Sequence, residues 1–162
     1  MTLRNLLLCG VLYLCLSGAG VTLTSAQGAS AVPTKDVRVI LLGTASGPRA
    51  FVDKAGISTL VEAGGERFLF DAGRGFMQRL VQAGFPMNAV TKLFLTHLHS
   101  DHVVGVPDLM LSPWSAAPER TVPLEVWGPD GTRDMTHRLE EAFAFDIHMR
   151  RDVDENFSAD GS

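Results

Sequence analysis

One six-residue stretch narrows the possible folds of this 162-residue chain more than any other feature: His97-Leu98-His99-Ser100-Asp101-His102. It directly follows residues 92–96 (KLFLT), whose apolar character predicts a buried strand. If the chain stays extended after that strand, His97 and His99 point to the same side and can bind one ion. A turn at Ser100 would then bring the following side chains round toward a second ion. The spacing therefore predicts a metal-binding loop at the end of a strand.

The donor types in this stretch indicate which metal it suits. The predicted ligands are His97, His99, Asp101 and His102. Imidazole nitrogens with one carboxylate and no thiolate favour zinc, with iron and manganese as alternatives. Two ions about 3.5–4 Å apart can share a hydroxide and lower its pKa, which is chemistry suited to hydrolysis. A polar loop with solvated histidines is the alternative interpretation.

The N-terminus has the order of a secretory signal peptide. Arg4 precedes an unbroken apolar run over residues 6–16, and small residues follow up to Ala31. We therefore expect residues 1–31 to be a signal peptide, with Ala26 as the competing cleavage position, and the mature protein to be periplasmic or secreted. An uncleaved membrane anchor is the alternative; after cleavage we expect no stable membrane span. Both cysteines lie inside this segment, so the mature chain would form no disulfide.

Composition favours a globular chain and argues against nucleic acid as a partner; with export, the acidic balance makes a small-molecule ester the expected substrate. Hydrophobic residues make up 46% of the sequence, which is enough for a packed core. The 14 basic and 18 acidic side chains leave a formal net charge of -4. Because this balance offers no basic footprint, nucleic acid is not expected as a partner.

Alternating apolar strands and amphipathic helices predict an α/β fold. A hairpin is expected around Gly64-Gly65, and Thr132 is expected to cap the last helix. No linker divides the chain, so we expect one domain over residues 32–162. Strands are predicted at residues 37–42, 57–62, 67–70, 92–96 and 124–127, and helices at 74–83 and 133–149.

The metal motif carries a family resemblance. Together with the preceding strand LFLT, residues 97–102 resemble the signature of the metallo-β-lactamase superfamily. Residues 42–48 (LGTASGP), 70–73 (FDAG) and 127–132 (WGPDGT) narrow this to a branch resembling ribonuclease Z and arylsulfatase-like exported hydrolases. The resemblance implies a four-layer αββα sandwich, two zinc ions at the sheet edge and hydrolysis by a metal-bound hydroxide.

The resemblance also implies a role for each residue of the motif. His97 and His99 would bind the first zinc ion, and Asp101 with His102 the second. Asp101 would also be catalytic, orienting or deprotonating the attacking water. Asp71 would support the metal loop from outside the coordination sphere, with helix capping as the alternative.

The chain departs from the family after its first half. The complete family site has a later histidine, a bridging aspartate and a final histidine, none of which precedes Ser162. His137 and His148 fall in the last predicted helix and are expected to be solvated. We therefore expect the N-terminal half only of the sandwich, with an open apolar sheet face that a stable monomer rarely tolerates. A truncated or partial sequence is the leading explanation, and a homodimer is the alternative. Trp114 is expected on a loop after the motif, at the pocket mouth or as a loop anchor.

These observations lead to an exported zinc-dependent hydrolase of a small ester as the main functional prediction. The ester would be a phosphodiester, sulfate ester, lactone or lactam. One alternative is a ribonuclease Z-like tRNA 3′ endonuclease. Another is a non-catalytic metal-binding fragment, because four ligands cannot complete two zinc sites and the chain alone would then be inactive.

Overall fold

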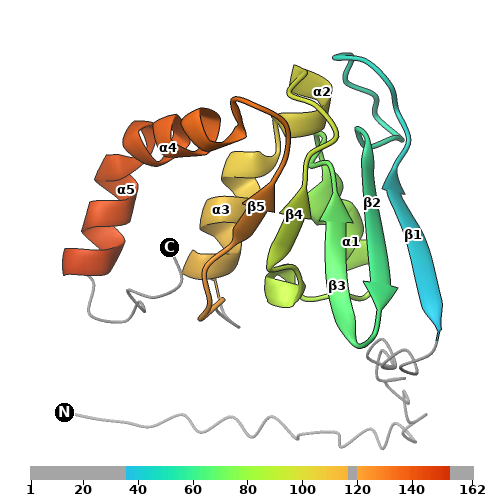
Figure 1. Ribbon diagram of the computed structural model, residues 1–162, viewed down its shortest axis with the longest axis horizontal. Coiled ribbons are helices and arrows are strands. Elements are labelled where there is room, and N and C mark those ends of the chain that lie inside the picture. The colour runs from blue at the N-terminus through green and yellow to red at the C-terminus, as the bar shows by residue number, and fades with distance from the viewer. Residues whose placement is uncertain (1–35, 117–119, 154–162) are drawn as a thin grey trace, which may run out of the picture.

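The computed structural model describes residues 36–116 and 120–153 (Figure 1). The predicted signal peptide, residues 1–31, lies outside this part. The strands are β1 (Val37–Gly43), β2 (Ser58–Ala63), β3 (Glu66–Phe70), β4 (Lys92–Phe94) and β5 (Glu125–Trp127). The helices are α1 (Phe76–Gln82), α2 (Ser100–Val103), α3 (Val106–Ser115), α4 (Thr132–Ala142) and α5 (Ala144–His148), with a 3₁₀ turn η1 (Met87–Ala89) and a π-helical turn η2 (Met149–Val153).

All five strands form one sheet in the order β1-β2-β3-β4-β5. The first three strands are antiparallel, and β3, β4 and β5 are parallel. The predicted hairpin turn is confirmed, because Gly64 and Gly65 join β2 to β3 with positive φ angles of 61° and 83°. Such angles favour glycine and match the twist of a two-residue hairpin.

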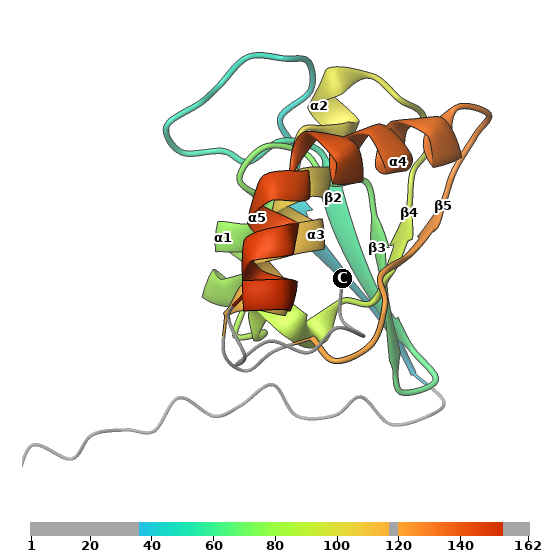
Figure 2. The ribbon, with the colours of Figure 1, turned by 90° about the vertical axis from the view of Figure 1, so that its left-hand side faces the viewer.

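The helices connect the parallel strands and cover one face of the sheet. α1 lies between β3 and β4 in sequence, and α2 with α3 lies between β4 and β5. Viewed from the side, α1, α3 and α5 gather on one side of the strands (Figure 2). The core between sheet and helices consists of fully buried apolar side chains, among them Leu60, Leu69, Phe76, Leu80, Leu93, Val106 and Leu109. This arrangement confirms the predicted α/β class.

The opposite face of the sheet is apolar and open in the described part of the chain. Val37, Val39 and Leu41 on β1 are 67%, 59% and 66% exposed. A ladder of aromatic rings continues this face across the parallel strands. Its ring pairs are Phe68–Phe94, Phe70–Phe94 and Phe94–Trp127, at centroid separations of 6.1, 5.3 and 4.7 Å. The sheet thus has one apolar face covered by helices and one apolar face open, which is the arrangement expected for half of an αββα sandwich.

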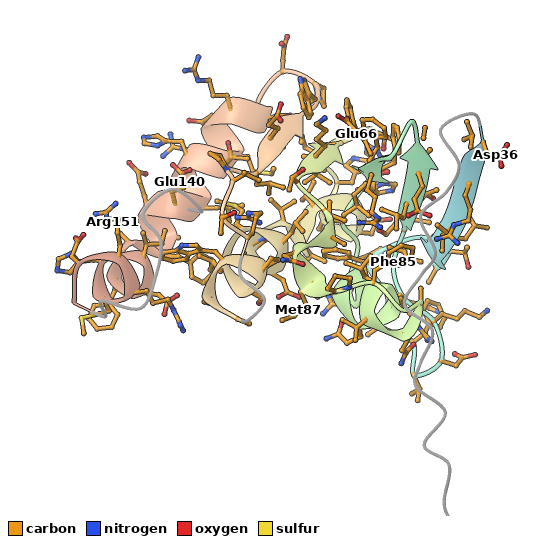
Figure 3. The ribbon with its side chains drawn as sticks, turned by 90° about the horizontal axis from the view of Figure 1, so that it is seen from below. Asp36, Glu66, Phe85, Met87, Glu140 and Arg151 are labelled. Atoms are coloured by element: carbon orange, nitrogen blue, oxygen red, sulfur yellow. The ribbon has the colours of Figure 1, made fainter. Side chains whose placement is uncertain are left out.

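A charged side chain is buried near the end of β2. Glu62 on β2 is only 4% exposed and forms ion pairs with Arg38 and, at 2.9 Å, with Arg67. Both guanidinium groups also lie over the ring of Phe85, which Figure 3 labels. A buried carboxylate is tolerated when it is paired in this way. The two arginines thereby lie between the Glu62 carboxylate and the Phe85 ring.

The last predicted helix is wrong in two respects. Residues 133–149 do not form one helix: α4 ends before Phe143, whose φ and ψ of −101° and 12° turn the chain into α5. Thr132 does not cap α4, because it is the first helical residue and its hydroxyl donates to the Pro129 carbonyl at 2.7 Å. Gly131 precedes the helix with a φ of 96°, a conformation that glycine adopts without strain.

The prediction of a loop after the metal motif is also wrong. α2 and α3 occupy most of that region, and Trp114 lies in α3 with 1% of its surface exposed. Pro113 interrupts the helical pattern in the sequence, whereas Pro107 lies in the first turn of α3, where proline is tolerated. No helix in the described ranges is long and apolar enough to cross a membrane.

Candidate metal centre

The metal motif lies at the edge where the three parallel strands end. Carboxyl ends of parallel strands meet at one edge of a sheet, and ligands often bind there. β3 is followed by Asp71, β4 by the segment 95–102, and β5 by the turn 128–131. Figure 1 shows α2, which contains part of the motif, at the upper end of the sheet. The fold therefore brings segments that are far apart in sequence to one edge.

Asp71 is the structural centre of this edge. It is 3% exposed and has a φ of 60°, a left-handed conformation that aspartate tolerates better than most residues. Its carboxylate accepts hydrogen bonds from the Thr96 N–H at 2.8 Å, the Thr96 hydroxyl at 2.8 Å and His102 Nδ1 at 2.7 Å. It does not cap α1, which begins after Gly75 with no side-chain cap. Asp71 thus supports the metal motif through hydrogen bonds to Thr96 and His102. The alternative role of Asp71, as a cap of α1, is wrong.

These hydrogen bonds determine which nitrogen of His102 faces outward. A carboxylate can only accept, so Nδ1 carries the proton that it shares with Asp71. In the neutral ring, Nε2 then keeps its lone pair for a metal ion. A histidine that donates its other ring N–H to a carboxylate is a usual partner of a bound metal. Thr96, which was not singled out in sequence, takes part in the same network through its contact with His97 Nδ1 at 3.1 Å.

Asp101 is held by the glycine-rich loop after β1. Its Oδ2 accepts a hydrogen bond from the Gly47 N–H at 2.8 Å, so this loop presents a backbone N–H group to the motif. Partial burial raises the pKa of Asp101. Hydrogen bonds from its own N–H and from Gly47, with the charges of His102 and His99, outweigh this and hold the pKa below its usual range. The side chain is therefore an anion at neutral pH.

The four predicted ligands lie close together. The rings of His97 and His99 are 4.6 Å apart, and those of His97 and His102 are 4.0 Å apart. His102 Nε2 lies 3.6 Å from Asp101 Oδ2. Two ligands of a tetrahedral zinc ion lie about 3.4 Å apart, so this pair fits one ion. The donor set, imidazole with carboxylate, also fits zinc.

The coordination sphere is not complete in this part of the protein. Among residues 36–116 and 120–153, no three histidine, cysteine or carboxylate side chains are placed so that they could hold one ion between them. Pairs alone do not saturate a zinc ion, which takes four ligands in a closed site. The assignment of His97, His99, Asp101 and His102 as metal ligands therefore stays a prediction.

Close backbone packing sets the position of the motif. The Ala72 N–H donates to the His102 carbonyl at 2.8 Å, and the Gly73 N–H donates to the Ile57 carbonyl at 2.9 Å. A side chain at position 73 would have its Cβ within 2.7 Å of the backbone of Gly56, Ile57 and Asp101. Glycine is required there because three backbone segments meet. The FDAG segment is thus a packing element of the site.

The remaining sequence candidates lie outside this centre. His137 is on α4, where it is 66% exposed and faces Glu140 and Glu141. His148 is on α5, 62% exposed, and its Nδ1 lies 2.6 Å from Asp152. Both are solvated helix residues, as predicted, although they belong to two different helices. Trp114 does not contribute to the metal site but lines a groove of about 980 Å³ between α3, β5, α4 and α5.

The chain is similar to a known protein family. A family model described as "Anti-Pycsar protein Apyc1" matches residues 37–124, more than half of the chain. The chain belongs to this family. Its metallo-β-lactamase fold and its ribonuclease Z-like character, both expected from the motif, are confirmed by the relatives described next.

Several curated relatives of this Apyc1-family chain are named ribonuclease Z. The protein of Mycolicibacterium gilvum is 44% identical over 116 residues, and that of Mycobacterium marinum is 42% identical over 118 residues. Each match covers 70% of this chain and about 40% of the relative. The chain therefore spans well under half the length of the curated relatives it matches.

Solved structures also support the metallo-β-lactamase fold and the ribonuclease Z-like character of this chain. Human tRNase Z, short form, superposes with a TM-score of 0.56 and 31% identity, over 65% of this chain and 39% of that one. The metallo-β-lactamase fold protein YhfI of Bacillus subtilis superposes with a TM-score of 0.52 at 20% identity, over 63% of this chain and 40% of that one, which supports the fold alone.

The expectation that nucleic acid is not a partner is wrong by these comparisons. The relatives are named as ribonucleases, one of them as a tRNase. The net charge of the whole chain does not describe the charge near the site. Arg49 and Arg74 both line a hollow next to Asp101.

Proposed function

We propose that the protein to which this chain contributes is a metal-dependent phosphodiesterase that cleaves RNA, in the manner of a ribonuclease Z. The observation that carries the proposal is the 2.7 Å hydrogen bond between Asp71 and His102. This hydrogen bond leaves Nε2 of His102 available to bind a metal ion. His102 belongs to a motif of three histidines and one aspartate at the edge of the sheet. The similarity to ribonucleases Z supports RNA as the substrate class.

The residues of this chain would perform distinct tasks. His97 and His99 would hold one zinc ion, and Asp101 with His102 the other. Bound zinc supplies Lewis-acid activation of water and neutralises charge on a phosphoryl oxygen. Asp101, an anion fixed by the Gly47 N–H, would orient the attacking water. Asp71 and Thr96 would keep the histidine rings in the orientation that binding requires.

The rest of the site would come from outside the described residues. The curated relatives are more than twice as long as the stretch they share with this chain. A ligand set of two side chains per ion leaves each zinc ion open to further ligands. The 162-residue chain by itself would therefore bind metal weakly and turn over little substrate.

An exported hydrolase of small esters is the second candidate. The observation that favours it is the apolar run at residues 6–16 behind Arg4, which is typical of a signal peptide. Export would separate the protein from intracellular tRNA and expose it to small phosphodiesters. Both candidates use the same predicted metal ligands, so substrate preference distinguishes them.

The test uses the product of the complete reading frame that encodes this chain, together with the 162-residue chain alone. Zinc-loaded protein is given a precursor tRNA with a 3′ trailer and, separately, bis(p-nitrophenyl) phosphate. We expect cleavage of the tRNA precursor, and loss of at least 100-fold in kcat/KM for His99→Ala. The matched control is His137→Ala, which removes an exposed histidine of α4. Turnover of the small diester without any cleavage of RNA would reject the main proposal in favour of the second candidate.

A further inference from the structure

A small hollow lies beside Asp101 of the metal motif. Its volume is about 30 Å³, which leaves room for a group the size of one or two oxygen atoms. Three segments form its lining. Arg49 comes from the loop after β1, Arg74 from the turn between β3 and α1, and Ser100 with Asp101 from the start of α2. Two guanidinium-bearing residues therefore stand at the border of the candidate metal centre.

No acidic side chain in the described part of the chain neutralises the positive charges of Arg49 and Arg74. Both residues are exposed, and neither side chain forms a hydrogen bond or an ion pair with any residue in the ranges 36–116 and 120–153. Asp101, the acidic residue in the lining of the hollow, accepts a hydrogen bond from the Gly47 N–H and forms no ion pair with Arg49 or Arg74. The exposed arginines of α4 and η2 behave differently, since Arg138 on α4 and Arg151 on η2 each pair with an aspartate.

The backbone of Arg74 is fixed although its side chain is exposed. Its carbonyl accepts a hydrogen bond from the Gly56 N–H at 2.8 Å. The preceding residue, Gly73, packs directly against the backbone of Asp101. The Arg74 side chain therefore extends from a backbone position that is fixed relative to the motif, so only side-chain freedom is lost when its guanidinium group binds a ligand.

We propose that Arg74, assisted by Arg49, binds a phosphate of the RNA chain next to the phosphate that is cleaved. A guanidinium group binds phosphate oxygens in a bidentate manner, and the Arg49 and Arg74 side chains at the border of the hollow can do so from its solvent side, away from the Asp101 carboxylate. This inference rests on the proposed function, and it adds that the site selects polynucleotides over esters with one phosphate. Arg74 thus positions the reacting phosphate through its neighbour along the strand.

The first experiment measures binding without turnover. Fluorescent precursor tRNA is titrated with the complete reading-frame product in EDTA, at 50 to 200 mM salt, with circular dichroism to verify folding. We expect Arg74→Ala to weaken RNA binding about tenfold. The slope of the logarithm of the association constant against the logarithm of the salt concentration should become less negative by about 0.7 to 0.9, which corresponds to the loss of one phosphate contact. Arg74→Lys should keep most of the slope. The control Arg133→Ala removes an exposed arginine of α4 and should leave the slope unchanged.

The second experiment measures turnover by the zinc-loaded protein. We expect Arg74→Ala to raise KM for the tRNA precursor about tenfold and to change kcat/KM for bis(p-nitrophenyl) phosphate less than twofold, since this diester has one phosphate. A general structural defect would lower both activities together. If the salt slope of Arg74→Ala equals that of the wild type, the phosphate site is rejected even where RNA is cleaved. If binding depends on Arg74 but RNA is not cleaved, the phosphate site stands and the proposed function fails. Absence of RNA binding by the wild type rejects both.

Discussion

Arg120 replaces a hydrogen bond that Pro113 cannot make. Its Nη1 donates to the Leu109 carbonyl at 2.7 Å, the acceptor to which an N–H at position 113 would donate in a regular helix. Its Nη2 donates to the Met110 carbonyl at 2.8 Å. Arg120 is 2% exposed, and burial lowers the pKa of its guanidinium to about 10. α3 is therefore helical through a proline because a side chain from beyond its end completes it.

This relationship predicts a non-additive pair of substitutions. Arg120→Ala should lower the free energy of unfolding by about 1–3 kcal/mol, because it leaves a buried carbonyl without its donor. In a Pro113→Ala background, where the backbone N–H is present, we expect the cost to fall by about 1 kcal/mol. Urea denaturation of the four proteins measures the coupling. Strictly additive effects would show that Arg120 does not compensate for the proline.

Asp71→Asn should weaken zinc binding without unfolding the protein. The amide cannot offer His102 an ionised acceptor, so Nε2 becomes a poorer ligand. Loss of such a supporting carboxylate costs about 10- to 100-fold in metal affinity. Competition against a chromophoric chelator measures the affinity, and Asp134→Asn on the exposed face of α4 is the control. Equal affinities for the two variants would mean that Asp71 has no influence on the metal.

Gly73→Ala should be among the most destabilising substitutions near the motif. Its Cβ would lie 2.5 Å from the Gly56 carbonyl carbon and 2.6 Å from the Ile57 nitrogen, which are backbone atoms that cannot rotate away. We expect a loss of about 3 kcal/mol in unfolding free energy. Gly84→Ala is the comparison, because position 84 has open space and only its φ of 87° is unfavourable, at a cost of about 1 kcal/mol. Chemical denaturation should rank the two variants in this order.

The carboxyl of Asp152 should titrate at unusually low pH. Hydrogen bonds from Arg151, and then from His148, lower its pKa to about 2. Because the folded pKa lies below the ordinary 3.8, the contribution of these contacts is present above about pH 3.8 and is lost as pH falls through 2. Carboxyl NMR titration should therefore give a midpoint near 2. Arg151→Ala should raise it more than His148→Ala, and a midpoint near 3.8 in the unaltered chain would contradict the pairing.

Local patterns were sufficient for much of the fold. The hairpin around Gly64-Gly65 and the strands on either side of it were predicted to within a residue, because turn chemistry and β-branched runs act over short distances. The same reasoning failed at Pro113, which lies inside α3, and at Phe143, where the expected last helix is divided into α4 and α5. Helix α3 depends on Arg120 from outside the helix, and such a partner has no signature in a local window.

The sequence by itself determined the identity and spacing of the predicted ligands, His97, His99, Asp101 and His102, and their place after a strand, since these are properties of adjacent residues. Only the tertiary structure decided what holds them. Asp71 lies 31 positions before His102 and Gly47 lies 54 positions before Asp101, yet each pair is joined by a hydrogen bond. Contacts over such separations exist because parallel strands bring their carboxyl ends to one edge. The same edge places Arg74 beside the motif.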